Sequence, residues 1–291
     1  MNEHVVVPPA WVEDNLDAVR VVDVRDEWEY DGIGHVPGAV NVPFDRFRSD
    51  VHAAERDGKR TDDESSGDGE RTDDESASGA GSEGMLPDPD AWSRLLSEAG
   101  VAPDDDVVAY DDEHGVFAAR FLVTALLYGH PPERLHLLDG DFSAWSREHE
   151  TSRETPTVEA TEYEASRLAA SASPLVDYET VRDALDGDAV VVDTREPWEY
   201  EEGHLPGAVQ LDWRELVDEK TRGLKPRDEL ESVLRARGVT PDRRIVLYCN
   251  TARRISHTFV VLQHLGYDDV EFYEGSLTEW NERGGPLERE S

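Results

Sequence analysis

The sequence has few cysteines, few lysines and no long apolar run. Cys249 is the sole cysteine of the 291 residues, which excludes an internal disulfide and any metal site built from several cysteines. No apolar stretch approaches the ~20 residues of a transmembrane helix. The segment Met1-Asn2-Glu3-His4 lacks the basic and apolar regions that open a signal peptide. We therefore expect a cytoplasmic protein that does not act at a membrane.

Positive charge is scarce as well. The chain has 29 Lys plus Arg against 66 Asp plus Glu, a formal net charge of −37, and three of the cations are lysines. Such a surface cannot neutralise a row of phosphates, so nucleic-acid binding and docking to anionic lipid are excluded as general functions. Acidic excess with little lysine is typical of proteins from salt-rich cytoplasm, where the Debye length falls to ~3 Å and carboxylate repulsion is screened. The composition predicts a halophilic protein.

The chain contains two copies of one pattern. Three blocks recur in the same order: VVDVRDEWEYDGIGHVPGAVNV at 21–42 and VVDTREPWEYEEGHLPGAVQL at 191–211; VVAYD at 107–111 and IVLYC at 245–249; LDG with a later Trp at 138–145 and YEG with a later Trp at 273–280. Ordered repetition of this kind predicts two domains of one fold, each with a site at the corresponding position.

The copies differ in the length of one connection. The first copy has an acidic insertion at about 52–84, which includes an 11-residue repeat rich in Ser, Gly, Asp and Glu and is expected to be disordered. We predict an N-terminal domain at 1–148, a linker at 149–173 and a C-terminal domain at 174–291.

Strand and helix patterns alternate in both copies. Short β-branched runs predict buried strands at Val19–Val24, Val107–Tyr110, Val190–Val192 and Ile245–Tyr248. Helical patterns, several of them ending at glycine, predict helices at Trp92–Ala99, Ala118–Tyr128, Tyr178–Leu185, Arg227–Arg237 and Arg254–Leu265. The alternation predicts an α/β fold: in each domain a mostly parallel sheet with helices on both faces.

Cys249 is the strongest candidate for chemistry. It directly follows a predicted strand and precedes a predicted helix, which places it at the carboxyl edge of a parallel sheet, where ligands bind in open α/β folds. The helix N-terminus and the adjacent Arg253 and Arg254 favour a thiolate over a thiol. A lone cysteine can also be a simple core residue, but the corresponding residue of the first copy is Asp111, so the position does not require a small apolar side chain. We predict a reactive thiol.

These residues resemble the rhodanese family, specifically its tandem-domain thiosulfate and 3-mercaptopyruvate sulfurtransferases. The D-x-R…E-Y…G-H-x-P-G-A block occurs twice, CNTARR resembles the active-site loop, and EGSLTEW resembles the closing block. The resemblance implies that the first domain, with Asp111 at the cysteine position, is non-catalytic. It also implies that Cys249 carries a persulfide in a ping-pong reaction without metal or organic cofactor. The implied substrate-binding residues are those of the loop: Asn250, Thr251, Ala252, Arg253 and Arg254.

The resemblance implies a small anionic sulfur donor and a cyanide or thiol acceptor. Two arginines in the loop favour thiosulfate, although Ala252 and Arg253 stand where the family usually has Gly and Val. 3-Mercaptopyruvate as donor, and a sulfur-relay module that passes its sulfur to a protein partner, are kept as alternatives. Related phosphatases and arsenate reductases use a loop one residue longer. Here Arg254 stands five positions after the cysteine, so the C-x5-R pattern fails.

Several repeated residues are expected to be structural. Asp193, Arg195 and Glu199 are predicted to form an ion-pair set at a strand end, because the same set, Asp23, Arg25 and Glu29, occurs in the copy without the nucleophile. His35 and His204 precede a P-G-A turn and have no second metal ligand nearby in the sequence. His257, on the helix after the loop, is predicted to be a packed or exposed residue. The repeated tryptophans are predicted to lie in the core or between the domains: Trp28, Trp145, Trp198 and Trp280.

Overall fold

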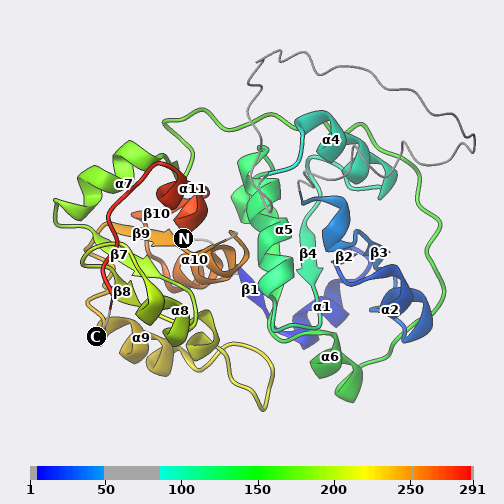
Figure 1. The fold of residues 1–291 in the computed structure, drawn as a ribbon. Coiled ribbons are helices and arrows are strands. Elements are labelled where there is room, and N and C mark those ends of the chain that lie inside the picture. Colours follow the sequence, from blue (N-terminus) through cyan, green and yellow to red (C-terminus); the bar gives the residue numbers. More distant parts are fainter. Residues whose placement is uncertain (1–4, 49–85, 251, 290–291) are drawn as a thin grey trace, which may run out of the picture.

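The computed structural model describes residues 5–48, 86–250 and 252–289. The predicted insertion at 52–84 and the loop residue Thr251 lie outside these residues. Within them the chain forms two α/β halves that stand side by side (Figure 1). Each half has a five-stranded sheet in which every pairing is parallel.

The two sheets have equivalent strand orders, β1-β5-β4-β2-β3 and β6-β10-β9-β7-β8. The strands of the first sheet are β1 (Val6–Val7), β2 (Arg20–Asp23), β3 (Val40–Asn41), β4 (Val107–Tyr110) and β5 (Leu135–Leu138). Those of the second are β6 (Leu175–Val176), β7 (Val190–Asp193), β8 (Val209–Gln210), β9 (Ile245–Tyr248) and β10 (Val270–Tyr273). The predicted duplication of a parallel α/β unit is confirmed.

Helices cover both faces of each sheet, as the alternating pattern predicts. The N-terminal half has α1 (Pro9–Asn15), α2 (Glu27–Gly32), α4 (Pro89–Glu98), α5 (Val116–Leu127), α6 (Phe142–Glu148) and the 3-10 turns η1 (Phe44–Arg46) and η2 (Pro132–Arg134). The C-terminal half has α7 (Tyr178–Leu185), α8 (Pro197–Glu202), α9 (Arg227–Arg235), α10 (Arg253–Leu265), α11 (Ser276–Glu282) and η3 (Trp213–Leu216). All five predicted helices occur, with bounds within three residues of those expected.

Each sheet separates two hydrophobic layers. In the N-terminal half α4 and α5 pack on one face and α1 and α6 on the other. In the C-terminal half α9 and α10 pack on one face and α7 and α11 on the other. The strands are buried on both faces, which explains why they are continuous apolar runs without polar alternation.

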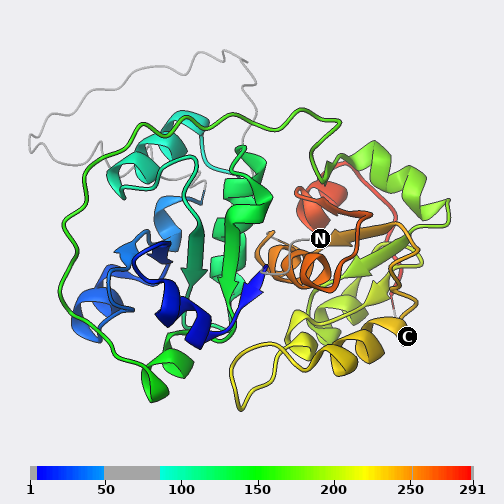
Figure 2. The same ribbon diagram turned by 180° about the vertical axis from the view of Figure 1, so that it is seen from behind.

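The two halves meet through α5 and α10, which lie side by side between the sheets (Figures 1 and 2). One cluster of buried apolar side chains runs from one half into the other through these helices. The edge strand β1 also contacts α10 (Figure 2). A shared apolar core makes this junction extensive, so the loop ahead of α10 is held against the N-terminal half.

The segment that connects the halves, residues 149–173, runs along the outside of the N-terminal half (Figure 1). Its backbone donates hydrogen bonds from Ser166 to Tyr128 and from Leu168 to Leu127. Its Tyr163 side chain is 4% exposed and packs in the core. This connection is therefore bound along its length to one half. Among the described residues, no helix is both long enough and apolar enough to span a bilayer.

The tryptophan prediction is half correct. Trp145 and Trp280 are buried, at 1% and 0% exposure, but Trp28 and Trp198 are 66% and 56% exposed. The two exposed indoles lie in the first turn of α2 and α8, where each donates its N–H to the carboxylate at the helix N-cap. They recur because both copies use the same helix start.

Candidate active site

Cys249 lies where the sequence predicts, directly after β9 at the carboxyl edge of the second sheet. Its backbone N–H donates to Ser276 Oγ at 3.2 Å, and its carbonyl accepts from the N–H of Leu277 at 3.0 Å. Ala252, in the left-handed region with φ +62°, then turns the chain into α10. The side chain of Cys249 is thus fixed at a helix N-terminus, where free N–H groups and the helix dipole stabilise an anion.

In the first copy, the loop that corresponds to the Cys249 loop binds the carboxylate of Asp111 through its backbone. This carboxylate accepts four backbone hydrogen bonds, from the N–H groups of Glu113, Gly115, Phe117 and Ala118, at 2.8 to 3.0 Å. Burial raises the pKa of Asp111 to about 6 against these donors, which lower it. The carboxylate therefore occupies the backbone anion site of its own loop.

The two loops share their backbone turn. The residue before each helix, Gly115 at the N-cap of α5 and Ala252 at the N-cap of α10, lies in the left-handed region with φ +85° and +62°. A left-handed residue at this point lets the loop N–H groups converge on the side chain at the end of the strand.

Glu199 anchors the Cys249 loop, which differs from the prediction. Asp193 and Arg195 pair as expected, with Arg195 Nη2 2.6 Å from Asp193 Oδ2. Glu199 instead accepts from Asn250 Nδ2 at 2.7 Å and forms an ion pair with Arg254. Asn250 and Arg254, expected to bind substrate, therefore bind a carboxylate of their own domain. The matching positions of the first copy hold other residue types, so the pattern match gave no sign of this contact.

Arg253, unlike Arg254, contacts aromatic rings and no carboxylate of the described residues. Its guanidinium lies over the rings of Phe44 and Phe117 of the N-terminal half, at 5.7 and 5.1 Å from their centroids. No carboxylate of the described residues lies within ion-pair distance of it. Burial lowers the pKa of Arg253, the Cys249 charge opposes that shift, and the Arg254 charge adds to it. Arg253 is thus a half-buried cation beside the thiol, available to an anionic ligand.

A cavity of about 420 Å³ opens beside Arg253. Its other walls come from the N-terminal half and include Phe44, Phe117, Glu29 and Arg48. The cavity therefore lies at the junction of the two halves, with Arg253 on one side and the Asp111 loop on the other.

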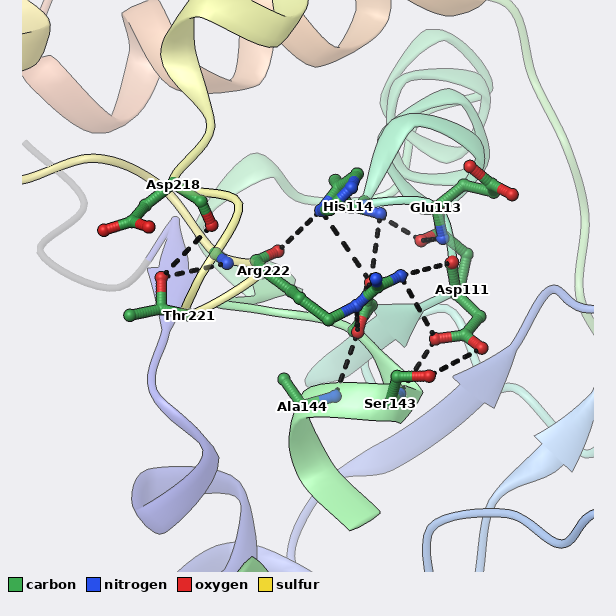
Figure 3. Close-up of polar contacts among 12 residues, drawn as sticks. Asp111, Glu113, His114, Ser143, Ala144, Asp218, Thr221 and Arg222 are labelled. Atoms are coloured by element: carbon green, nitrogen blue, oxygen red, sulfur yellow. Dashed lines mark hydrogen bonds and ion pairs between the residues drawn. The ribbon is translucent and has the colours of Figure 1, made fainter. Parts of the chain in front are cut away.

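A turn of the C-terminal half fastens that junction (Figure 3). Arg222, with φ +65°, donates from Nε to both carboxylate oxygens of Asp141 at 2.8 and 2.7 Å and from Nη2 to the carbonyl of Asp112. The Arg222 carbonyl faces His114 Nδ1 at 3.3 Å. No sequence pattern indicated this contact, because Arg222 lies in a polar loop outside every repeated block. Ser276, which accepts from the Cys249 backbone N–H, lies in the repeated block EGSLTEW. The pattern of that block does not mark it as a contact of the cysteine.

The histidines are packed residues. His204 stacks on Tyr200 with ring centroids 3.6 Å apart, and His35 stacks on Tyr30 in the same way at 3.9 Å. Within residues 5–48, 86–250 and 252–289, no group of three His, Cys, Asp or Glu side chains is placed to hold a metal ion. His257 is fully buried on α10 against Trp213.

His257 should make acid conditions destabilising. Burial, with a smaller contribution from the charge of His114, lowers the pKa of His257 to about 4 from 6.5. Between these values the unfolded chain binds a proton that the folded chain does not, so lowering the pH costs up to about 3 kcal/mol. The raised pKa of Asp111 acts in the opposite direction over nearly the same range. We expect His257→Leu to gain about 3 kcal/mol relative to the unmodified chain as the pH falls from 6.5 to 4.

Denaturant unfolding at a series of pH values, at one high salt concentration, measures that difference. The comparison of two proteins at each pH cancels the contribution of the many surface carboxylates. Parallel pH profiles for the two proteins would contradict a neutral buried His257.

Comparison with known proteins agrees with this geometry. A family model described as "Rhodanese-like domain" matches residues 8–148 and 177–283. A thiosulfate sulfurtransferase from Azotobacter vinelandii is 34% identical over 221 residues, 70% of this chain and 78% of the relative. The sulfur carrier protein TtuD from Thermus thermophilus is 27% identical over 95% of this chain and 93% of its own. The fold matches the crystal structure of the 3-mercaptopyruvate sulfotransferase SseA from Escherichia coli with a TM-score of 0.70, at 23% identity and 94% and 98% coverage of the two chains.

Proposed function

The chain belongs to the rhodanese family, and from that premise we propose that it is a thiosulfate sulfurtransferase with Cys249 as the sulfur carrier. The Cys249 thiolate attacks the outer sulfur of thiosulfate, the S–S bond of the donor breaks, and sulfite leaves with the bonding electron pair. A Cys249 persulfide remains. Cyanide or a thiolate then attacks its terminal sulfur, leaves as thiocyanate or as a persulfide, and restores the Cys249 thiolate. One covalent carrier used twice gives ping-pong kinetics.

The observation that carries this proposal is the backbone anion site seen around Asp111. Four N–H groups of that loop converge on one side-chain anion. The Cys249 loop makes the same left-handed turn into a helix, with a sulfur atom in place of the carboxylate. N–H groups so arranged would stabilise both the thiolate and the terminal persulfide sulfur, which carries negative charge.

The donor is proposed from Arg253, which forms no ion pair with a carboxylate of the described residues. Arg254 is engaged by Glu199, so of the two loop arginines Arg253 is left to bind the donor's sulfonate group. The name of the Azotobacter vinelandii relative supports thiosulfate, and 3-mercaptopyruvate is the alternative donor. Because Asp111 is not a sulfur nucleophile, we propose that 1–148 is a non-catalytic domain and 174–291 the catalytic one, in a cytoplasmic, salt-adapted protein.

A second candidate is a sulfur relay, in which the persulfide passes to a protein acceptor. The likeness to a protein named as a sulfur carrier over almost the whole chain supports it. Rapid transfer to one co-purifying protein, with slow turnover by cyanide, would favour this function over small-molecule transfer.

Steady-state kinetics in high salt with each donor tests the proposal. We expect kcat/KM for thiosulfate, followed by sulfite release, to exceed that for 3-mercaptopyruvate, followed by pyruvate release. Mass spectrometry should find a gain of about 32 Da, one sulfur atom, on the peptide that contains Cys249. A faster reaction of 3-mercaptopyruvate would overturn the donor assignment. Absence of the added sulfur with both donors would overturn the function.

A further inference from the structure

The cavity beside Arg253 is lined mainly by the N-terminal half, which lacks the nucleophile. Its volume is larger than the proposed donor needs. Thiosulfate is a small ion, whereas the space measures about 420 Å³. Of its lining residues, Arg253 comes from the C-terminal half and the others from the N-terminal half. In a ping-pong reaction the same site receives the acceptor after the donor product leaves, so the larger substrate sets the size of the space.

Comparison of the two copies locates a carboxylate in this cavity that lacks the ion-pair partner of its counterpart. Glu199 of the C-terminal half is bound by the guanidinium of Arg254 and the amide of Asn250. Its counterpart is Glu29. The residues that correspond to its two partners are Phe117, the second residue of α5 as Arg254 is of α10, and Asp112, which follows Asp111 as Asn250 follows Cys249. The first copy has thus retained the carboxylate and lost the cation that the second copy supplies.

Glu29 lies in the cavity wall and is half-buried. It accepts one hydrogen bond, from the backbone N–H of Asp26 at 3.2 Å, within the capping box of α2. Burial raises the pKa of Glu29, and the charges of Asp26 and Asp112 add to this shift, while the Asp26 N–H and the charge of Arg25 oppose it. A ligand cation would relieve this arrangement, as Arg254 does for the matching carboxylate in the other copy.

The cavity offers a ligand two charged groups, its two poles, because its other arginines, Arg25 and Arg48, pair with aspartates. Arg253 offers a guanidinium, held over Phe44 and Phe117, to an anionic group. Glu29 offers a carboxylate to a cationic group. A ligand with both charges and a thiol fits these two poles and brings its sulfur to the loop that would carry the persulfide.

We propose that the degenerate site of the N-terminal half binds the sulfur acceptor, an aminothiol whose ammonium group pairs with Glu29 and whose carboxylate pairs with Arg253. This proposal rests on the sulfurtransferase function proposed above. The acceptor thiolate attacks the terminal sulfur of the Cys249 persulfide, the S–S bond of the persulfide breaks, and the acceptor leaves as its own persulfide. The N-terminal half then binds the acceptor, and the C-terminal half supplies Cys249, which carries the sulfur.

Single-turnover kinetics separate the two halves of the reaction. The enzyme is first loaded with thiosulfate and freed of excess donor, and the decay of the persulfide is followed at rising acceptor concentration. Four probes are compared at equal thiolate concentration: cysteine with both charges, 3-mercaptopropionate with the carboxylate, cysteamine with the ammonium, and 2-mercaptoethanol with neither. We expect cysteine to show the lowest half-saturation concentration.

Glu29→Gln is the decisive variant, because glutamine keeps an oxygen for the Asp26 N–H and removes only the charge. We expect its half-saturation concentration to rise about five-fold for cysteine and cysteamine, the effect of one partly exposed ion pair, and to stay unchanged for 3-mercaptopropionate. Glu27→Gln, on the exposed side of the same helix, is the matched control and should change neither.

Equal effects of Glu29→Gln on all four thiols, or none on any, would overturn the acceptor assignment while leaving the sulfurtransferase function intact. Failure of thiosulfate to load Cys249 would instead overturn the function itself. The two failures appear in different steps of the experiment.

Discussion

Replacing Cys249 with serine is expected to reduce sulfur transfer from thiosulfate to background. The hydroxyl of serine is a much weaker nucleophile than a thiolate at neutral pH and would need an adjacent base to attack the donor. The persulfide intermediate also requires a sulfur atom at this position. The expected result is loss of sulfite release together with loss of the added mass of about 32 Da.

The fold should survive this change. The hydrogen bonds of Cys249 are made by its backbone N–H and carbonyl, with Ser276 Oγ and the N–H of Leu277, and serine retains both. Serine is also nearly isosteric with the buried thiol. Thermal unfolding in high salt would check that the inactive variant is folded. Asp111→Asn is the matched control at the same position of the other copy, and it should lose stability but keep the mass gain on Cys249. A Cys249→Ser variant that still turns over thiosulfate would refute the carrier role.

The features that the sequence predicted correctly are those encoded locally or by repetition. The apolar run Ile245–Tyr248 and the helical pattern after it place Cys249 at a strand end, and both elements occur. The match of 107–111 with 245–249 placed Asp111 at the corresponding point. Periodicity and internal repetition are strong signals, because each copy constrains the interpretation of the other.

The contacts that the sequence did not predict join segments far apart in the chain. Recurrence of the same three residues predicts that Glu199 joins Asp193 and Arg195, yet it binds Arg254, 55 positions away. Arg222 reaches Asp141 from a loop of the other half. Neither contact has a spacing or composition signature, because each depends on how elements pack. The repeated block shows that a residue such as Glu199 has a structural role, but its partner depends on the tertiary structure.

Breaking the buried ion pair between Arg120 and Glu274 is expected to destabilise the protein strongly. Arg120 on α5 donates to both carboxylate oxygens of Glu274, after β10, at 3.0 and 2.5 Å, and joins the two halves. The side chains are 3% and 9% exposed. Removing one partner leaves a buried charge without its counter-ion, so we expect Arg120→Met to lose about 3–5 kcal/mol in the free energy of unfolding.

Arg46→Met is the matched control, since it breaks an Arg–Glu pair with Glu98 whose side chains are 50% and 65% exposed. It should cost about 1 kcal/mol or less. Denaturant titration in high salt measures both losses, and equal small losses would contradict a buried junction pair.

The double variant Arg120→Met with Glu274→Leu separates the two roles that this pair can have. With both charges removed, no counter-ion is missing, so most of the lost stability should return. Activity should not return with it to the same extent, because Glu274 lies two residues before Ser276, whose Oγ binds the Cys249 backbone. Stability recovered without full activity would show that the junction pair positions the catalytic loop as well as holding the halves together. Recovery of both would assign the pair to stability alone.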